Sequence, residues 1–357
     1  MLDDTNARRA TFVAGLILLI VLAAVVVMSA EFHVDRIDRI GIPRQTTGEA
    51  FGPITAGLIS AAATGTRGEG LMASLAPIGE SLSATFPDDA LATYDIGIAP
   101  EAAIDVLDEL LESALPDLHE WLAKTLDEFR ATSGLDPHTD FLSHLDHRLT
   151  VALLAPESDP DGWPFPRKVV ILRVLDEVAV AQFLEAWVSW EAGAIAPKTH
   201  GVLGASVVSE VVADFEVIGL ALNGLLPAGL PLPSPSYALV GDHLIVSSVR
   251  SGVAETLGRL ANGVPLTRPL NSEDRVVEIV RLNFSEWPGA WLRAEPFVAS
   301  LVDRLGGDSP AVIGFCRTMM RHLGEFGTAH GTTSLTPQGG LVLLFEIQPT
   351  VRSMTDY

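Results

Sequence analysis

Short apolar runs bounded by turn-forming residues alternate along the chain with stretches in which apolar residues recur every three or four positions. The runs predict β-strands and the stretches predict amphipathic helices. A clear order begins at Leu91. It comprises a strand at 92–98, two helices between Glu101 and Arg130 that are divided at Pro116, and strands at 148–155 and 168–175.

The same order recurs near the end of the chain, although few residues are identical between the two blocks. The second block comprises a strand at 276–283, helices at 295–305 and 310–323, and strands at 327–335 and 341–347. A turn at 336–340 joins the last two strands. We interpret the pattern as an architectural repeat of strand, helix, helix, strand and strand.

The region between the two blocks contains further elements. We expect a helix at 177–190 capped by Asp176, a strand at 204–212, a proline-rich stretch at 223–236 without regular structure, a hairpin at 237–248, and a helix capped by Ser251 that ends before Gly263. Gly241-Asp242 suits the tight turn of that hairpin. Because strand pairs outnumber isolated strand–helix alternations, the fold class is α+β with mostly antiparallel sheets.

Residues Thr11 to Ala30 form an uncharged apolar run of 20 residues. As a helix this run would span about 30 Å, the thickness of one hydrocarbon core. We interpret it as a transmembrane anchor, and a cleaved signal peptide is the alternative. The pair Arg8-Arg9 next to the run favours a short cytoplasmic tail, with the folded part outside the cytoplasm and periplasmic or extracellular, although basic residues also follow the run.

These features divide the chain into successive parts. The expected parts are a tail at 1–10, the anchor at 11–30, a Gly-, Ala- and Thr-rich tether and entry region at 31–90, a first α+β lobe at 91–263, a second at 264–350 and a tail at 351–357. The length beyond the anchor favours two abutting lobes over one domain.

Charge and cysteine content narrow the function classes. The formal net charge is −22, and it falls entirely after residue 30, because two aspartates and two arginines balance in residues 1–30. Such a surface repels nucleic acid and anionic lipid headgroups, so we expect no nucleic-acid partner. Cys316 is the only cysteine, which excludes an intrachain disulfide and a thiolate metal cluster.

With this order established, the chain resembles a family of bacterial extracytoplasmic proteins, Domain of Unknown Function 3352, over residues 86–350. The features that carry the resemblance are FPDDALATYDIGI, SGLDPHTDFLSHLDHRLTVALLAP, KVVILRVLDEVAVAQFLEAW and YALVGDHLIVSSVRSGVAETLGRL. The family usually carries an N-terminal anchor or signal. The resemblance implies no reaction, catalytic residue or cofactor.

The stretch DPHTDFLSHLDH is the most suggestive motif for metal chemistry. It contains His138, Asp140, His144, Asp146 and His147, whose imidazole and carboxylate groups suit zinc or iron. A structural turn that leads into the strand at 148–155 is the competing interpretation. The motif has no HExxH spacing, so the metal ligands stay candidates only.

Two loops with apolar residues are candidate partner contacts. The first, 161–166, carries Trp163 and Phe165, and the second, 225–233, carries Leu226, Leu230 and Leu232. Exposed apolar residues on loops mark contact surfaces. The alternative is that they fold back over the sheet.

No catalytic constellation indicates an enzyme, because the chain has no Gly-x-Ser-x-Gly elbow and no P-loop lysine, and no cofactor is predicted. The main hypothesis is a membrane-anchored, extracytoplasmic binding or scaffold module for a protein or an envelope component. A metal-dependent hydrolase centred on residues 138–147 is one alternative. A carrier of an apolar ligand held between sheet and helices is the other.

Overall fold

A computed structural model describes most of the chain after residue 74 and two earlier strands. The described residues are 37–41, 54–61 and 75–348, with gaps at 102–103, 106–107, 109–110, 113–115, 159–161, 199–202, 225–231, 271–274, 305–306 and 336–340. The predicted anchor and most of the predicted tether lie outside these residues. Within the described part, no helix is long and apolar enough to cross a membrane.

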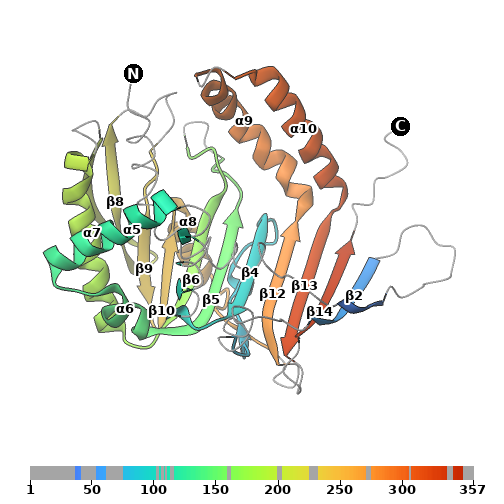
Figure 1. Ribbon diagram of the computed structural model, residues 1–357, viewed down its shortest axis with the longest axis horizontal. Helices are drawn as coiled ribbons and strands as arrows, with labels where there is room; N and C mark the ends of the chain where they lie inside the picture. Colours follow the sequence, from blue (N-terminus) through green and yellow to red (C-terminus); the bar gives the residue numbers. More distant parts are fainter. Residues whose placement is uncertain are drawn as a thin grey trace.

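Within the described residues, twelve strands form one antiparallel sheet (Figure 1). Their order across the sheet is β1 (Ile37–Gly41), β2 (Ile54–Ala61), β14 (Leu341–Gln348), β13 (Thr328–Leu335), β12 (Val276–Asn283), β4 (Ala92–Gly97), β5 (Leu145–Leu154), β6 (Arg167–Val174), β10 (His243–Ser247), β9 (Ser236–Val240), β8 (Phe215–Gly224) and β7 (Leu203–Val212). A separate pair joins β3 (Glu80–Ser81) to β11 (Arg268–Pro269). The predicted α+β class with antiparallel strands is confirmed.

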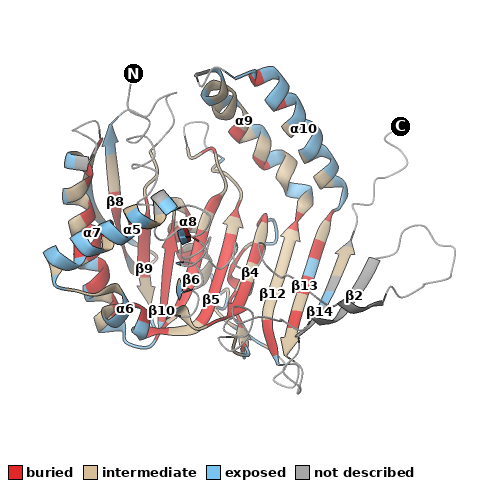
Figure 2. Cartoon of the chain, in the orientation of Figure 1, coloured by how far each residue is buried: buried red, intermediate tan, exposed pale blue. Residues whose placement is uncertain are grey.

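Helices cover the β5 to β8 part of the sheet on both faces. One face carries α5 (Pro116–Ser133), α6 (Pro137–Asp140), the 3-10 turn η2 (Leu142–His144) and α7 (Glu177–Lys198). The other face carries α8 (Arg250–Ala261) and the 3-10 turn η1 (Ser83–Thr85). The strands between these layers are buried on both sides (Figure 2), which explains why β6 and β10 are almost continuously apolar.

In the described residues, two runs of elements follow the predicted order, and we call them the first and second copies; they meet at the centre of the sheet. The first copy runs from β4 through described helical residues between 100 and 112 and α5 to β5 and β6. The second copy runs from β12 through α9 (Trp287–Arg304) and α10 (Ser309–Glu325) to β13 and β14. Because β4 and β12 pair antiparallel, with Tyr94 opposite Val280, and the strand order is β14-β13-β12-β4-β5-β6, a pseudo-two-fold axis relates the strands of the two copies. Both predicted lobes therefore contribute to one sheet.

Strand β8 was missed by the sequence pattern. It forms a hairpin with β7 through Ala213 and Asp214, which both have positive φ, 51° and 70°. Positive φ at both central residues is the geometry of a type I′ turn, which asparagine and glycine usually occupy. An Ala-Asp turn carries no glycine signal, so the pattern did not predict the second strand.

Several predicted helix ends also differ from the structure. Helix α7 continues to Lys198, and α9 begins at Trp287, eight positions before the predicted residue 295. The prediction that Ser251 caps α8 is wrong, because Val249 is the N-cap residue and makes no side-chain cap. The Ser251 hydroxyl donates instead to the Glu157 carboxylate in the β5–β6 loop.

Helices α9 and α10 form a hairpin at the ends of strands β12 and β13, which they connect (Figure 1). The Arg293 guanidinium ties this hairpin to the β5–β6 loop by donating to the carbonyl oxygens of Glu157 and, at 3.1 Å, Ser158. On α10, Ile313 is buried, whereas Phe315 is 69% exposed. The two helices of the hairpin therefore pack against each other, and α9 is also held by the β5–β6 loop of the first copy.

Gly97 lies at the end of β4, where an earlier segment of the chain packs closely against the strand. The backbone of residue 76 crosses the end of β4 there, and the Ala76 N–H donates to the Gly97 carbonyl at 3.0 Å. A Cβ on Gly97 would overlap the carbonyl oxygen of Ala76. We expect Gly97→Ala to lower the free energy of unfolding by roughly 3 kcal/mol, because backbone must move to admit the methyl group. Urea titration of the full chain, followed by tryptophan fluorescence, measures this loss.

Gly204→Ala is the matched control, because nothing lies within 4 Å of the position that a methyl group on this β7 glycine would occupy. Its effect should stay within about 0.5 kcal/mol. Equal losses for the two variants would contradict the predicted clash.

Candidate functional site

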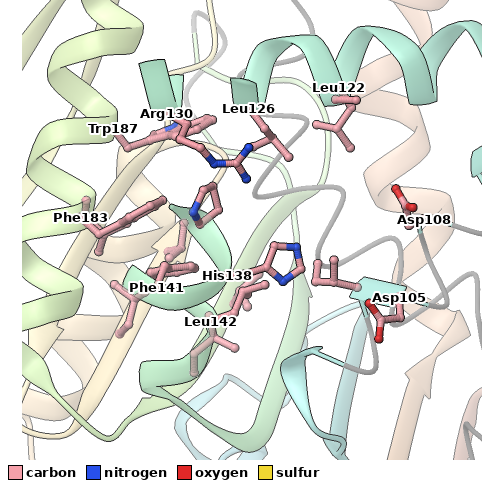
Figure 3. Close-up of a pocket in the computed structure, with 18 of the residues that line it drawn as sticks. Asp105, Asp108, Leu122, Leu126, Arg130, His138, Phe141, Leu142, Phe183 and Trp187 are labelled. Carbon is pink, nitrogen blue, oxygen red and sulfur yellow. The ribbon is translucent and has the colours of Figure 1, made fainter. Parts of the chain in front are cut away.

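A cavity of about 330 Å³ lies between the sheet and the helices that cover strands β6, β10 and β9 (Figure 3). Helix α5, the α6–η2 turn and α7 form its outer walls, and strands β6, β9 and β10 form its floor. Protein pockets that bind small-molecule ligands typically have volumes of roughly 300–1,000 Å³. The volume is therefore sufficient for a small ligand, at the lower end of that range.

The walls follow directly from the apolar patterns of the elements. Leu122 and Leu126 lie one turn apart on α5, and the strand residues that alternate toward this face are apolar. The apolar lining residues are Ile104, Leu111, Leu122, Ala123, Leu126, Pro137, Phe141, Leu142, Val170, Leu172, Phe183, Leu184, Trp187, Leu244 and Val246. Transfer of an apolar solute from water into such a site is favourable, because apolar surface leaves contact with water.

An aromatic cluster fixes one side of the cavity. The ring of Phe141 stacks on Phe183 with centroids 4.9 Å apart, and Phe129, which is fully buried, lies 4.8 Å from Trp187. Figure 3 places Phe183 and Trp187 together at one side of the view, with Asp105 and Asp108 at the other. These packed rings have few alternative rotamers, so this wall is preorganised.

Exposed charged residues surround the cavity at its solvent side, which we call the mouth. The mouth consists of Asp105, Asp108, Asp127, Arg130 and His138. The Arg130 guanidinium lies 2.8 Å from Asp127 and 2.8 Å from Asp136, which joins α5 to the α6 turn. The Asp136 carboxylate accepts a hydrogen bond from the His138 backbone N–H, and this bond together with Arg130 lowers the pKa of Asp136.

Tyr237 on β9 is the one buried polar residue among the described residues that line the cavity. It is 5% exposed, and its hydroxyl oxygen is buried without a hydrogen-bond partner in the described structure. Burial raises the pKa of Tyr237, and the nearby carboxylates of Glu185 and Glu216 raise it further. An unsatisfied buried hydroxyl carries a desolvation cost that a ligand atom can remove.

The structure separates the predicted metal ligands. His138 lies at the mouth, Asp140 accepts a 2.6 Å hydrogen bond from the Asp136 N–H, and His144 lies in η2. His147 on β5 contacts Asp146, with 2.6 Å between Nδ1 and Oδ1. In the described part of the chain, no group of three or more His, Cys, Asp or Glu side chains is placed to hold a metal ion. The geometry gives the metal-site hypothesis no support.

The predicted partner-contact residues divide between two environments. Trp163 and Phe165 form an edge-to-face pair, and the Phe165 ring lies 6.5 Å from Phe297 of α9. Leu232 packs against the apolar cluster between the sheet and helices α5, α6 and α7, whereas Leu226 and Leu230 lie outside the described residues. Phe165 therefore lies beside α9 and Trp163 packs on Phe165, and the role of the two residues with a partner stays a prediction.

Asp95 forms a second buried polar cluster, on the opposite face of β4. Its carboxylate accepts hydrogen bonds from the hydroxyls of Ser81 and Thr150, and from the Ser83 N–H at 3.4 Å. Burial raises the pKa of Asp95, and the three donors oppose that change. The cluster fastens residues 81–83 to the sheet, which is a structural role.

Comparison of the whole chain with models of protein families, with curated proteins and with solved structures finds no match. The resemblance to the Domain of Unknown Function 3352 family stays a prediction.

The unsatisfied hydroxyl of Tyr237 has a measurable consequence in the ligand-free protein. We expect Tyr237→Phe to raise the free energy of unfolding by about 1 kcal/mol, because it removes a buried group that lacks a partner. Tyr94→Phe is the matched control, because the Tyr94 hydroxyl hydrogen-bonds the Glu278 carboxylate. That variant should lose about 1 kcal/mol.

Chemical denaturation of the two variants, after removal of apolar solutes with an adsorbent resin, compares them directly. A loss of stability in Tyr237→Phe equal to that in Tyr94→Phe would mean that the Tyr237 hydroxyl has a partner.

Proposed function

We propose that this chain is a non-enzymatic binding protein that holds a small apolar ligand between its sheet and helices. The observation that carries the proposal is the apolar cavity with a single buried, unpartnered hydroxyl, that of Tyr237, among its described lining residues. The predicted anchor at residues 11–30 would keep this carrier at a cell membrane, with the folded part outside the cytoplasm.

The chemistry of the cavity favours binding over catalysis. General acid–base catalysis requires a titratable group held against the substrate in a shielded site. Apart from Tyr237, the titratable side chains that line the cavity are exposed at its mouth. The buried lining is apolar, so its contribution is burial of ligand surface, about 0.8 kcal/mol for each buried CH₂ group.

A protein or envelope partner stays the second candidate function. The specific observation in its favour is an apolar stripe on the outer side of α10, formed by Val312, Phe315 and Met319 at helical spacing. Each of these side chains is exposed in the isolated chain. A ligand carrier that passes its ligand to a partner would combine both candidate functions.

Filling the cavity tests the carrier proposal. We expect the full chain, purified from its host in lipid nanodiscs, to retain a small apolar molecule that solvent extraction and mass spectrometry identify. Leu126→Trp places a larger ring in the cavity from α5, so the amount of this molecule per protein should fall by about tenfold or more. Leu175→Trp is the control, because Leu175 is 65% exposed and does not line the cavity.

The comparison between the two variants removes the contribution of nanodisc lipids, which both preparations contain equally. Equal amounts of every extracted molecule in wild type, Leu126→Trp and Leu175→Trp would refute the carrier proposal.

A further inference from the structure

The charges around the cavity are strongly unbalanced. Its lining residues include three aspartates, Asp105, Asp108 and Asp127, and one arginine, Arg130. The three aspartates and one arginine have a formal net charge of −2. An ionised ligand that enters here therefore meets a negative field at the mouth.

Arg130 offers little compensation to an anion. Its guanidinium is 2.8 Å from both Asp127 and Asp136, so two carboxylates already share the one cation. Asp136 carries its negative charge readily, because its pKa is lowered by the His138 backbone N–H and by Arg130. An anionic headgroup would compete with both carboxylates for the same guanidinium.

The charged side chains near the buried Tyr237 are also negative. Glu185 on α7 and Glu216 on β8 lie close enough to Tyr237 to raise the pKa of its phenol in addition to the effect of burial. Tyr237 is 95% buried, since it is 5% exposed, and its hydroxyl has no partner in the described structure. A neutral hydroxyl in a negative field is a suitable acceptor for an N–H or O–H of a ligand.

We propose that the cavity selects amphiphiles whose polar group is positively charged, such as a protonated amine, and rejects anionic amphiphiles such as fatty acids. The apolar lining holds the hydrocarbon part, and the net negative charge of the mouth attracts the cation. Asp105 and Asp108 contribute most to this attraction, since Asp127 is ion-paired with Arg130 at 2.8 Å; Asp108 lies 2.9 Å from the His119 imidazole. This selectivity rests on the proposed carrier function, and the experiment below separates the failure of one from the failure of the other.

Three probes with one hydrocarbon chain and different headgroups test the proposal. Dodecylammonium, dodecanol and dodecanoate are each radiolabelled and dialysed to equilibrium against the full chain in nanodiscs of zwitterionic lipid. Leu126→Trp in the same nanodiscs supplies the blank for partition into lipid. Specific binding is the difference between the two preparations.

We expect dodecylammonium to bind wild type most tightly, dodecanol less tightly and dodecanoate least. In Asp105→Asn/Asp108→Asn, affinity for dodecylammonium should fall by about two- to thirty-fold, because two exposed attractions are lost. Dodecanol binding should stay unchanged, which also establishes that the variant folds. Raising the salt concentration should weaken dodecylammonium binding in wild type more than in the variant.

Glu101→Gln/Glu112→Gln is the matched control. Both glutamates are exposed in the same helical stretch, and neither lines the cavity. This variant loses the same formal charge, so an unchanged affinity for dodecylammonium assigns the effect to the mouth.

Two results would be adverse, and they have different meanings. Dodecanoate binding as tight as dodecylammonium binding, with dodecanol also bound, would overturn the charge selectivity and leave the carrier function intact. Absence of specific binding for all three probes would overturn the carrier function itself.

Discussion

The pairing of β4 with β12 is the contact on which the rest of the molecule depends, because it joins the two copies of the repeat into one sheet. The pair runs from Ala92 opposite Leu282 to Ile96 opposite Glu278. Side chains reinforce it: the Glu278 carboxylate accepts hydrogen bonds from Thr333, at 2.7 Å, and from Tyr94. Burial raises the pKa of Glu278, so these hydrogen bonds offset a cost of desolvation. Three neighbouring strands are thereby connected across the pseudo-two-fold axis.

From this common sheet the two copies diverge, and the divergence produces the cavity. On the side of the first copy, α5 packs through Phe129 toward α7, the helix that follows β6. Together these helices cover the sheet and enclose the apolar cavity against it. In the second copy, α9 and α10 pack on each other, and α9 is held by the β5–β6 loop through Arg293. Figure 2 shows the result, with buried residues concentrated on strands β4, β5, β6, β10 and β9. The same order of elements therefore supports two different surfaces.

Local patterns were sufficient to predict most elements, because each is specified by residues close in sequence. The Gly241-Asp242 turn and the apolar strands around it are one case, and the repeat order is another. The pattern failed where local chemistry was atypical, as at the Ala213-Asp214 turn before β8. One wall of the cavity could also be inferred from the sequence, since Leu122 and Leu126 recur at helical spacing in the helix predicted after Pro116. The cavity itself could not be inferred from the sequence, because its shape depends on how elements distant in sequence are placed in space.

Tyr237 and Asp105 illustrate why the site itself could not be predicted. They are 132 positions apart, and the structure brings both to one cavity. In the sequence, Tyr237 is one residue of a β-hairpin, and Asp105 is one acidic residue among many in a chain of net charge −22. The histidine-rich stretch 138–147 attracted attention because its residues are adjacent in sequence, yet its members are distributed over α6, η2 and β5. A binding site is defined by convergence in space. The Tyr237 hydroxyl, which has no partner among the described residues, is therefore a stronger indication of function than the density of possible ligands along the chain.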